Sequence, residues 1–414
     1  MKPIQSIVVL ALAAALCGCT AAISATKPAP APTVEGLGET ELRIARLETK
    51  HEKMPESART ACELAAAYIQ RGRETGELGN YTMARDLLRK TKEQHPKDRD
   101  TAVTLAWAST IFHDFETALG LADEAAKADP KDADAWGVVS DCHLELGDYD
   151  KAIEAAQKMI DLRPNLASYS RGAQLRWITG DAKGAQYMAS LAIQAGGNTE
   201  AMAWARVQSA DMALKVGAYA AAEDGYQKVL EAMPDYRHAL AGMARVRVAQ
   251  GRIEEAEKLM RRATQVGPSV TMLAELAAIE RLLGKDPRAT LAQAEAAQKE
   301  HMEIGIGGDE PALARVWLGA GTREREALAL MEEEARRHTS VPTFAALAWA
   351  RSANGKHEAA VKAAGLALRN GVQEPWVVRR CAEVYRAAGK TDMADKLERE
   401  ARALCPSKTL WELL

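Results

Sequence analysis

A few short motifs in the sequence carry residue types that are used for catalysis or ligand binding. Gly389-Lys390-Thr391 matches the end of a phosphate-binding loop, which also needs a Gly five residues earlier, where Val384 stands. The carboxylates of segment 129–134 could bind calcium, but such a loop needs Gly and Glu at its sixth and twelfth positions, where Asp134 and Ser140 stand. The eight His form no metal-ligand motif. We therefore predict turns and helix caps here, and no enzyme, cofactor or metal site.

The N-terminal segment has the residues of an export signal followed by a cysteine. Met1 and Lys2 precede an apolar run over residues 7–16, which is about 15 Å long as a helix and too short for a bilayer core. The next residues, Leu16-Cys17-Gly18-Cys19, resemble a bacterial lipobox. The resemblance implies a signal peptide over residues 1–18, lipidation of Cys19 and, because Thr20 follows, an outer membrane location facing the periplasm. Cys17 departs from the usual Ala or Ser, so a plain secretory signal stays open.

Residues 19–41 are rich in Ala, Pro and Thr, with Lys27-Pro-Ala-Pro-Ala-Pro-Thr33 at their centre. Proline fixes the backbone φ angle and removes a hydrogen-bond donor, so this segment favours polyproline II and cannot pack a core. We expect a disordered, semi-rigid tether that holds the folded body up to about 60 Å from the anchor.

The rest of the chain has the composition of a helical globular protein. Hydrophobic residues make up 47% and charged residues 27% of the 414 residues, while aromatic residues make up only 5%. Abundant Ala and Leu favour helices that pack closely over sheets. The net charge of -3 gives no electrostatic reason to expect nucleic-acid binding.

A 34-residue spacing organises this helical body. It separates Pro130 from Pro164 and Pro234 from Pro268. An Ala stands twelve residues before each Pro, and an aromatic residue or Ile stands three residues before that Ala. The alanines are Ala118, Ala152, Ala222 and Ala256, and the residues three positions before them are Phe115, Tyr149, Tyr219 and Ile253. The apolar residues in between recur at helical spacing around a Gly-containing break. The pattern predicts antiparallel helix pairs that must stack to bury both faces.

This pattern resembles the tetratricopeptide repeat. The resemblance implies an all-α fold, an α-solenoid of about nine stacked helix pairs, which covers nearly all of the chain after the tether. We expect an N-terminal array over residues 42–300, a Gly-rich connector or hinge over 301–310 and a C-terminal array over 311–414. The first unit is expected to have a long internal loop around residues 73–80.

The family resemblance also implies a concave groove lined by the first helix of each pair. Carried over unit by unit, the groove positions hold Trp, Arg and Asp, which suit an extended peptide or a partner helix. The alternative is that some of these Trp pack between repeats. The predicted groove residues are Trp107, Asp134, Asp141, Arg171, Trp204, Asp211, Arg245, Trp349, Trp376 and Arg379.

Four cysteines follow the leader, and export would place them in an oxidising compartment. Cys381 is expected midway along the first helix of the last pair, and Cys405 just beyond its second helix. An antiparallel hairpin brings these regions together, so a disulfide between them could form if their helical levels match. Cys62 and Cys142 are expected to be buried small apolar residues.

Two functions are compatible with these features. The first is a membrane-anchored scaffold that holds a protein partner within a bacterial envelope assembly, such as the secretion, pilus, outer-membrane or cell-wall machinery. The alternative is a carbohydrate-binding or hydrolytic accessory protein of the periplasm, because Trp faces suit sugar rings and paired carboxylates can cleave glycosidic bonds. The sequence offers no such carboxylate pair at a defined spacing, so we predict the scaffold.

Overall fold

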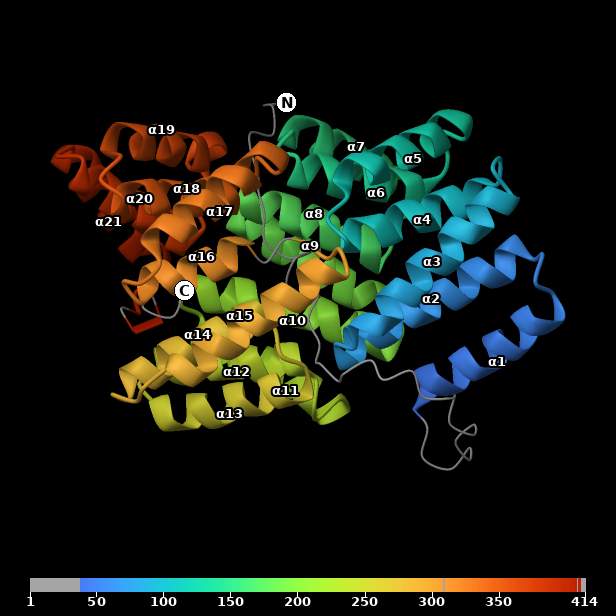
Figure 1. Cartoon of the computed structure of the whole chain (residues 1–414), viewed down its shortest axis with the longest axis horizontal. Coiled ribbons are helices and arrows are strands. Elements are labelled where there is room, and N and C mark those ends of the chain that lie inside the picture. The colour runs from blue at the N-terminus through green and yellow to red at the C-terminus, as the bar shows by residue number, and fades with distance from the viewer. Residues whose placement is uncertain (1–37, 308–309, 408, 411–414) are drawn as a thin grey trace.

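The computed structural model describes residues 38–307, 310–407 and 409–410, and the signal peptide, Cys19 and most of the predicted tether lie outside these residues. Every regular element in the described part is helical (Figure 1). The elements are α1 (Glu39–Lys53), α2 (Ala58–Thr75), α3 (Leu78–Gln94), α4 (Arg99–Ile111), α5 (Phe115–Ala128), α6 (Ala133–Glu145), α7 (Tyr149–Leu162), α8 (Leu166–Ile178), α9 (Ala182–Ala195), α10 (Thr199–Lys215), α11 (Tyr219–Ala232), α12 (Arg237–Ala249), α13 (Ile253–Val266), α14 (Val270–Leu282), α15 (Arg288–Glu303), α16 (Glu310–Gly319), α17 (Glu324–Arg337), α18 (Val341–Ala353), α19 (His357–Ala367), the short 3-10 helix η2 (Arg369–Gly371), α20 (Pro375–Ala387) and α21 (Thr391–Leu404).

Helices α2 to α21 form ten antiparallel pairs that stack in chain order, which confirms the predicted solenoid and adds one pair to the expected number. The alanines of the 34-residue pattern lie in the second helices of their pairs, and all are fully buried. Phe115 and Tyr149 begin second helices and are also buried. The small side chains let the helices approach closely, and the aromatic rings pack beside them.

Local sequence signals set the helix boundaries. Gly147 ends the turn between α6 and α7 with a φ of 77°, in the left-handed region that favours glycine, and His113 adopts a φ of 54° between α4 and α5. The carboxylate of Asp132 caps α6 by accepting hydrogen bonds of 3.0 Å from the backbone N–H groups of Asp134 and Ala135. The acidic segment 129–134 therefore acts as a helix cap.

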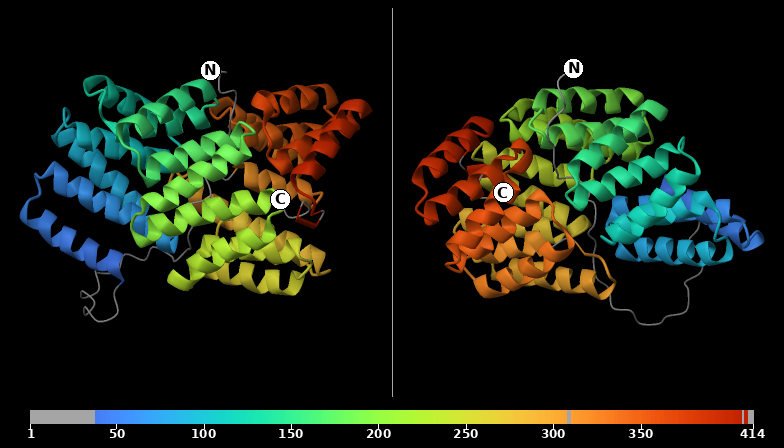
Figure 2. Two further views of the ribbon diagram at one scale, coloured as in Figure 1. Left: turned by 180° about the vertical axis from the view of Figure 1, so that it is seen from behind. Right: turned by 90° about the horizontal axis from the view of Figure 1, so that it is seen from above.

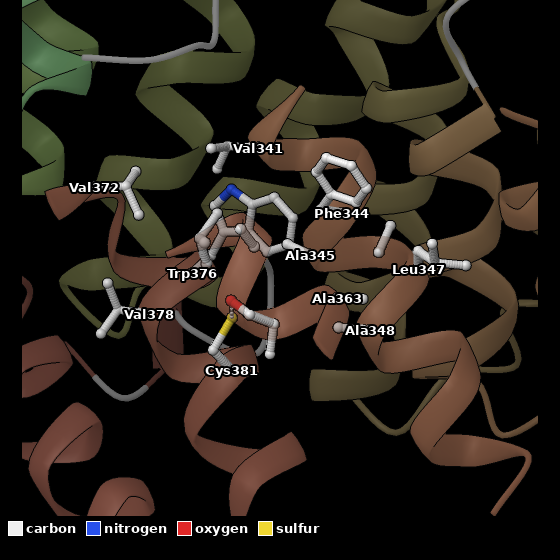
Figure 3. Close-up of a cluster of buried hydrophobic side chains, with 14 of the residues drawn as sticks. Val341, Phe344, Ala345, Leu347, Ala348, Ala363, Val372, Trp376, Val378 and Cys381 are labelled. Atoms are coloured by element: carbon white, nitrogen blue, oxygen red, sulfur yellow. Dashed lines mark hydrogen bonds between the residues drawn. The ribbon is translucent and has the colours of Figure 1, made fainter. Parts of the chain in front are cut away.

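The C-terminal array packs back against the N-terminal array, as both views in Figure 2 show. The backbone N–H of Val341 donates to the Tyr149 hydroxyl at 3.1 Å, and the Thr339 hydroxyl donates to the carbonyl of Leu146 at 2.6 Å. One hydrophobic cluster spans the two arrays and includes Trp177 and Trp376. Figure 3 shows the C-terminal part of this cluster around Trp376. The arrays thus share a core.

Three boundary predictions need correction or refinement. Helix α1 begins at Glu39, inside the predicted tether, because acidic residues in the first turn favour a helix N-terminus. The predicted loop at 73–80 is wrong, since α2 continues to Thr75 and only residues 76–77 separate it from α3. Helix α15 ends at Glu303 and α16 begins at Glu310, and between them Ile306 is buried against the first repeats.

The disulfide that the sequence left open is not formed, because Cys381 and Cys405 are both free. Cys381 lies six residues into α20, whereas Cys405 follows α21 near the start of α20, so their levels differ by about 9 Å along the helix axis. The two residues belong to separate hydrophobic clusters. Cys142 is buried as expected, and Cys62 is half-buried.

In the described part of the chain, no helix combines the length and the apolar character that crossing a membrane requires. Among the same residues, there is no group of three or more His, Cys, Asp or Glu side chains that could bind a metal ion.

Candidate protein-binding groove

The first helices of the first five repeats line a cavity of about 920 Å³. Helices α2, α4, α6, α8 and α10 supply most of its wall, as the resemblance implied for the concave face. Five predicted groove residues line the cavity: Trp107, Asp134, Asp141, Arg171 and Trp204. The volume is within the range of sites that hold several side chains of a ligand.

An ion pair joins the first and fifth repeats across this cavity. Arg73 near the end of α2 donates to both carboxylate oxygens of Glu200 at the start of α10, at 3.1 and 2.9 Å. The Arg73 guanidinium carbon also lies 5.7 Å from the centre of the Trp107 ring. Glu200 is almost completely buried, so the bidentate pair is shielded from solvent. This pair therefore brings the first and fifth repeats into contact beside the cavity.

The charged residues of the groove are largely paired with one another. Arg171 donates to both oxygens of Asp141, at 2.9 and 2.5 Å, and Arg163 contacts Asp134. Arg99 pairs with the carboxylates of Asp129 and Asp132 in the turn before α6. Burial raises the pKa of Asp141, although the nearby positive charge of Arg171 opposes this shift. These pairs neutralise the wall, so it has little net charge to offer a ligand.

The two tryptophans are the largest apolar side chains among the residues that line the groove. Trp107 and Trp204 are half-buried, and Trp204 packs edge-on against His238 with ring centres 5.6 Å apart. Each therefore has a packed side and an accessible side. The packed side agrees with the packing alternative, and the accessible side provides the surface that the binding alternative requires.

The other predicted groove residues lie outside this cavity, because the C-terminal array and neighbouring repeats use them. Asp211 and Glu275 both pair with Arg245, which binds the Glu275 carboxylate at 3.0 and 3.1 Å. Trp376 is buried in the shared core, and Trp349 lies in a separate small pocket. Arg379 pairs with Glu383 on its own helix at 3.0 Å. These residues therefore do not line the cavity that Trp107 and Trp204 line.

Sequence reasoning missed several residues that line the groove. Arg73 falls within the predicted loop at 73–80, and its partner Glu200 lies 127 residues away, so no periodic pattern links the two. Gln174 and Gln208 also line the cavity, and their 34-residue separation was a usable signal.

Comparison with known families agrees with this architecture. Family models described as tetratricopeptide repeat match residues 112–167 and 213–279. The chain is a tetratricopeptide repeat protein. Proteins of this family bind protein partners, so the repeats indicate a protein-interaction scaffold. A search of curated proteins found no match to this tetratricopeptide repeat protein.

Several solved structures are similar to the chain. A tetratricopeptide repeat protein from Parabacteroides merdae is 14% identical, with 59% of this chain and 99% of that chain covered and a TM-score of 0.43. PilW, a type IV pilus biogenesis factor, is 21% identical, with coverages of 48% and 92% and a TM-score of 0.42. Human IFIT1, in a dimer with m7Gppp-AAAA, is 13% identical, with coverages of 88% and 86% and a TM-score of 0.49.

Proposed function

We propose that this tetratricopeptide repeat protein is a lipid-anchored scaffold of the bacterial envelope that holds a segment of a partner protein in its N-terminal groove. The observation that carries the proposal is the cavity of about 920 Å³ lined by Trp107, Trp204 and a set of paired charges. Tryptophan is among the residues that most often supply binding energy at protein interfaces, especially in enclosed pockets.

The wall chemistry defines the kind of segment that fits. Because the Arg73–Glu200 and Arg171–Asp141 pairs already satisfy their charges, a ligand with high net charge would gain little and would have to break them. Apolar side chains can instead rest on the accessible sides of the two tryptophans. The free amides of Gln174 and Gln208 can bind backbone groups of the same segment. A near-neutral segment with apolar anchor residues is therefore the preferred partner.

The envelope location rests on the N-terminal sequence. Lipidation of Cys19 would attach the chain to a membrane, with outer membrane sorting implied by Thr20, and the Pro-rich tether would carry the repeats into the periplasm. We expect Cys19→Ala to move the protein from the membrane pellet to the soluble fraction. If this variant stays in the pellet, the lipid-anchor part of the proposal is wrong, while the groove proposal is unaffected.

The groove is tested with a photo-crosslinking residue at position 208, which faces the cavity. The crosslinked protein is identified from envelope extract, and its binding segment is then measured with purified components. We expect Trp107→Ala and Trp204→Ala each to weaken binding of that segment about tenfold or more, by loss of an anchor contact. The control is Tyr187→Ala, because Tyr187 is highly exposed and does not line the groove.

Two outcomes contradict the proposal. The first is equal binding by the tryptophan variants and the Tyr187→Ala control. The second is a crosslink to polysaccharide, with loss of polysaccharide binding in Trp204→Ala and no protein partner, which would favour the carbohydrate-binding alternative.

A further inference from the structure

We propose that residues 27–33 of the chain itself occupy the groove when no partner is bound, so that a partner must displace them. This inference rests on the proposed function, because it names a regulator of the same groove. The segment, Lys27-Pro-Ala-Pro-Ala-Pro-Thr33, is the centre of the predicted tether and lies outside the described residues. The place where the described chain begins, the wall of the groove and the composition of the segment all favour this occupant.

The described chain begins beside the wall of the groove. At the start of α1, the Thr40 hydroxyl donates to Glu74 at 2.8 Å, and Glu41 pairs with Arg71 at 2.9 Å. These two partners lie near the end of α2, on either side of Arg73 in the sequence, and Arg73 lines the cavity. The chain therefore joins the repeats within one helical turn of the groove wall.

Both groove tryptophans lie near this entry point. The guanidinium carbon of Arg73 is 5.7 Å from the centre of the Trp107 ring. The ion-pair partner of Arg73, Glu200, precedes Trp204 by about one turn of α10. The contacts of Arg73 thus bring the two rings and the start of the described chain to the same part of the cavity wall.

The chain between the segment and α1 is long enough for this docking. Residues 34–37 separate the segment from Gly38, the first described residue. The Cα–Cα steps from Thr33 to Gly38 cover at most about 18 Å. The segment itself, in polyproline II conformation, covers about 22 Å more. The total of about 40 Å is several times the roughly 8–10 Å between the axes of packed helices, so the segment can lie across several first helices.

The composition of the segment suits the groove wall. Prolines favour polyproline II, which has no internal hydrogen bonds, and grooves lined by aromatic rings bind such segments at low entropic cost. Proline rings and alanine methyl groups can rest on the accessible sides of Trp107 and Trp204. Between residues 20 and 37 the only charged residues are Lys27 and Glu35, so the tether brings no net charge to a wall whose charges are already paired.

The wall also holds hydrogen-bond donors without acceptors. Gln174 lines the cavity and is 8% exposed, and its Nε2 has no hydrogen-bond partner among the described residues. The hydroxyl of Ser170, one turn earlier on α8, also lacks a partner in this part of the chain. Donors that are shielded from water and have no acceptor cost free energy. The segment offers a carbonyl at every residue while its prolines bring no N–H, so it supplies acceptors with few new donors.

The test is photo-crosslinking of the purified full chain, without partner, from a residue at position 208 in the groove. We expect peptide mapping to find a link to residues 27–33, and an excess of a synthetic peptide of residues 26–35 to reduce it. Pro28→Gly, Pro30→Gly and Pro32→Gly together should lower the yield about threefold or more, because the more flexible segment loses more entropy on docking. The matched control is the same crosslinking residue at position 187, where the native tyrosine is highly exposed outside the groove, and it should give no such link.

Isotope labelling identifies the occupant. In a mixture of labelled and unlabelled chains, links within one chain support the proposal, whereas links between chains assign the groove to the tether of a second copy and overturn it. The proposal is also overturned if position 208 gives no link to residues 27–33, or if the glycine variant links as well as the unchanged tether.

The two proposals fail separately. A partner captured from envelope extract at position 208, with no tether link in the purified chain, leaves the scaffold proposal intact. A tether link with no captured partner, even in the glycine variant, contradicts the scaffold proposal while docking of the tether stands. Circular dichroism of every variant confirms that it is folded.

Discussion

Removing Glu374 should loosen the C-terminal array from the N-terminal array. Glu374 precedes α20 and is only 1% exposed. Its Oε2 accepts a bond of 2.8 Å from Nζ of Lys215 on α10 and one of 3.1 Å from Nε1 of Trp177 on α8. Both partners are more than 150 residues away in the sequence, so one carboxylate links three helices from the two arrays.

The expected loss follows from burial. Glu374→Ala leaves the Lys215 ammonium without its carboxylate, and removing one partner of a buried ion pair costs about 3–5 kcal/mol. The Lys215 side chain is 17% exposed, so water can solvate part of the charge and the cost should be near the lower value, about 3 kcal/mol. Glu374→Gln should cost less, because its amide oxygen can still accept the bond from Trp177. The double variant Glu374→Ala with Lys215→Met should recover part of the loss, since no unpaired charge remains.

The free energy of unfolding is measured by urea titration with circular dichroism, and hydrogen exchange of α18 and α20 reports detachment of the C-terminal array. Glu400→Ala is the control, because Glu400 pairs with Lys396 at 3.8 Å on an exposed surface and its loss should cost at most about 1 kcal/mol. The reasoning is refuted if Glu374→Ala is no less stable than this control, or if the double variant shows no recovery.

Three further predictions concern the buried groups. Burial raises the pKa of Glu145 from 4.5 to about 7, so between these pH values the folded protein keeps a proton that the unfolded chain releases. The free energy of unfolding of the wild type should therefore fall, relative to that of Glu145→Gln, as the pH rises from about 4.5 to about 7. Parallel urea-unfolding curves across that range would contradict this. Gly242→Ala should lower the free energy of unfolding, measured by thermal unfolding, by about 2 kcal/mol or more, because its Cβ would lie 2.2 Å from the buried Tyr226 ring. Gly120→Ala places its Cβ in open space and should be neutral or stabilising. Peptide mapping without reductant should find Cys381 and Cys405 as free thiols, and a linked peptide would show that the described separation is wrong.

Much of the repeat architecture could be predicted because its determinants are local. Small alanines inside the second helices, aromatic residues at the starts of these helices and left-handed turns such as Gly147 act within one helix pair or between neighbours. These contacts recur every 34 residues, so the period itself reveals them. The same period placed Trp107, Asp141 and Trp204 on the concave side, where they line the cavity.

The contact between the first and fifth repeats and the burial of the remaining predicted groove residues depend on curvature that accumulates over many repeats. Small rotations between successive pairs bring Arg73 to Glu200 and Glu374 to Lys215, although more than 100 residues separate each pair. Such contacts occur once and leave no periodic signal. The sequence by itself therefore determined the helix pairs, their order and their concave side. Only the tertiary structure decided which part of that side stays open, because the path of the superhelix determines where the C-terminal array packs.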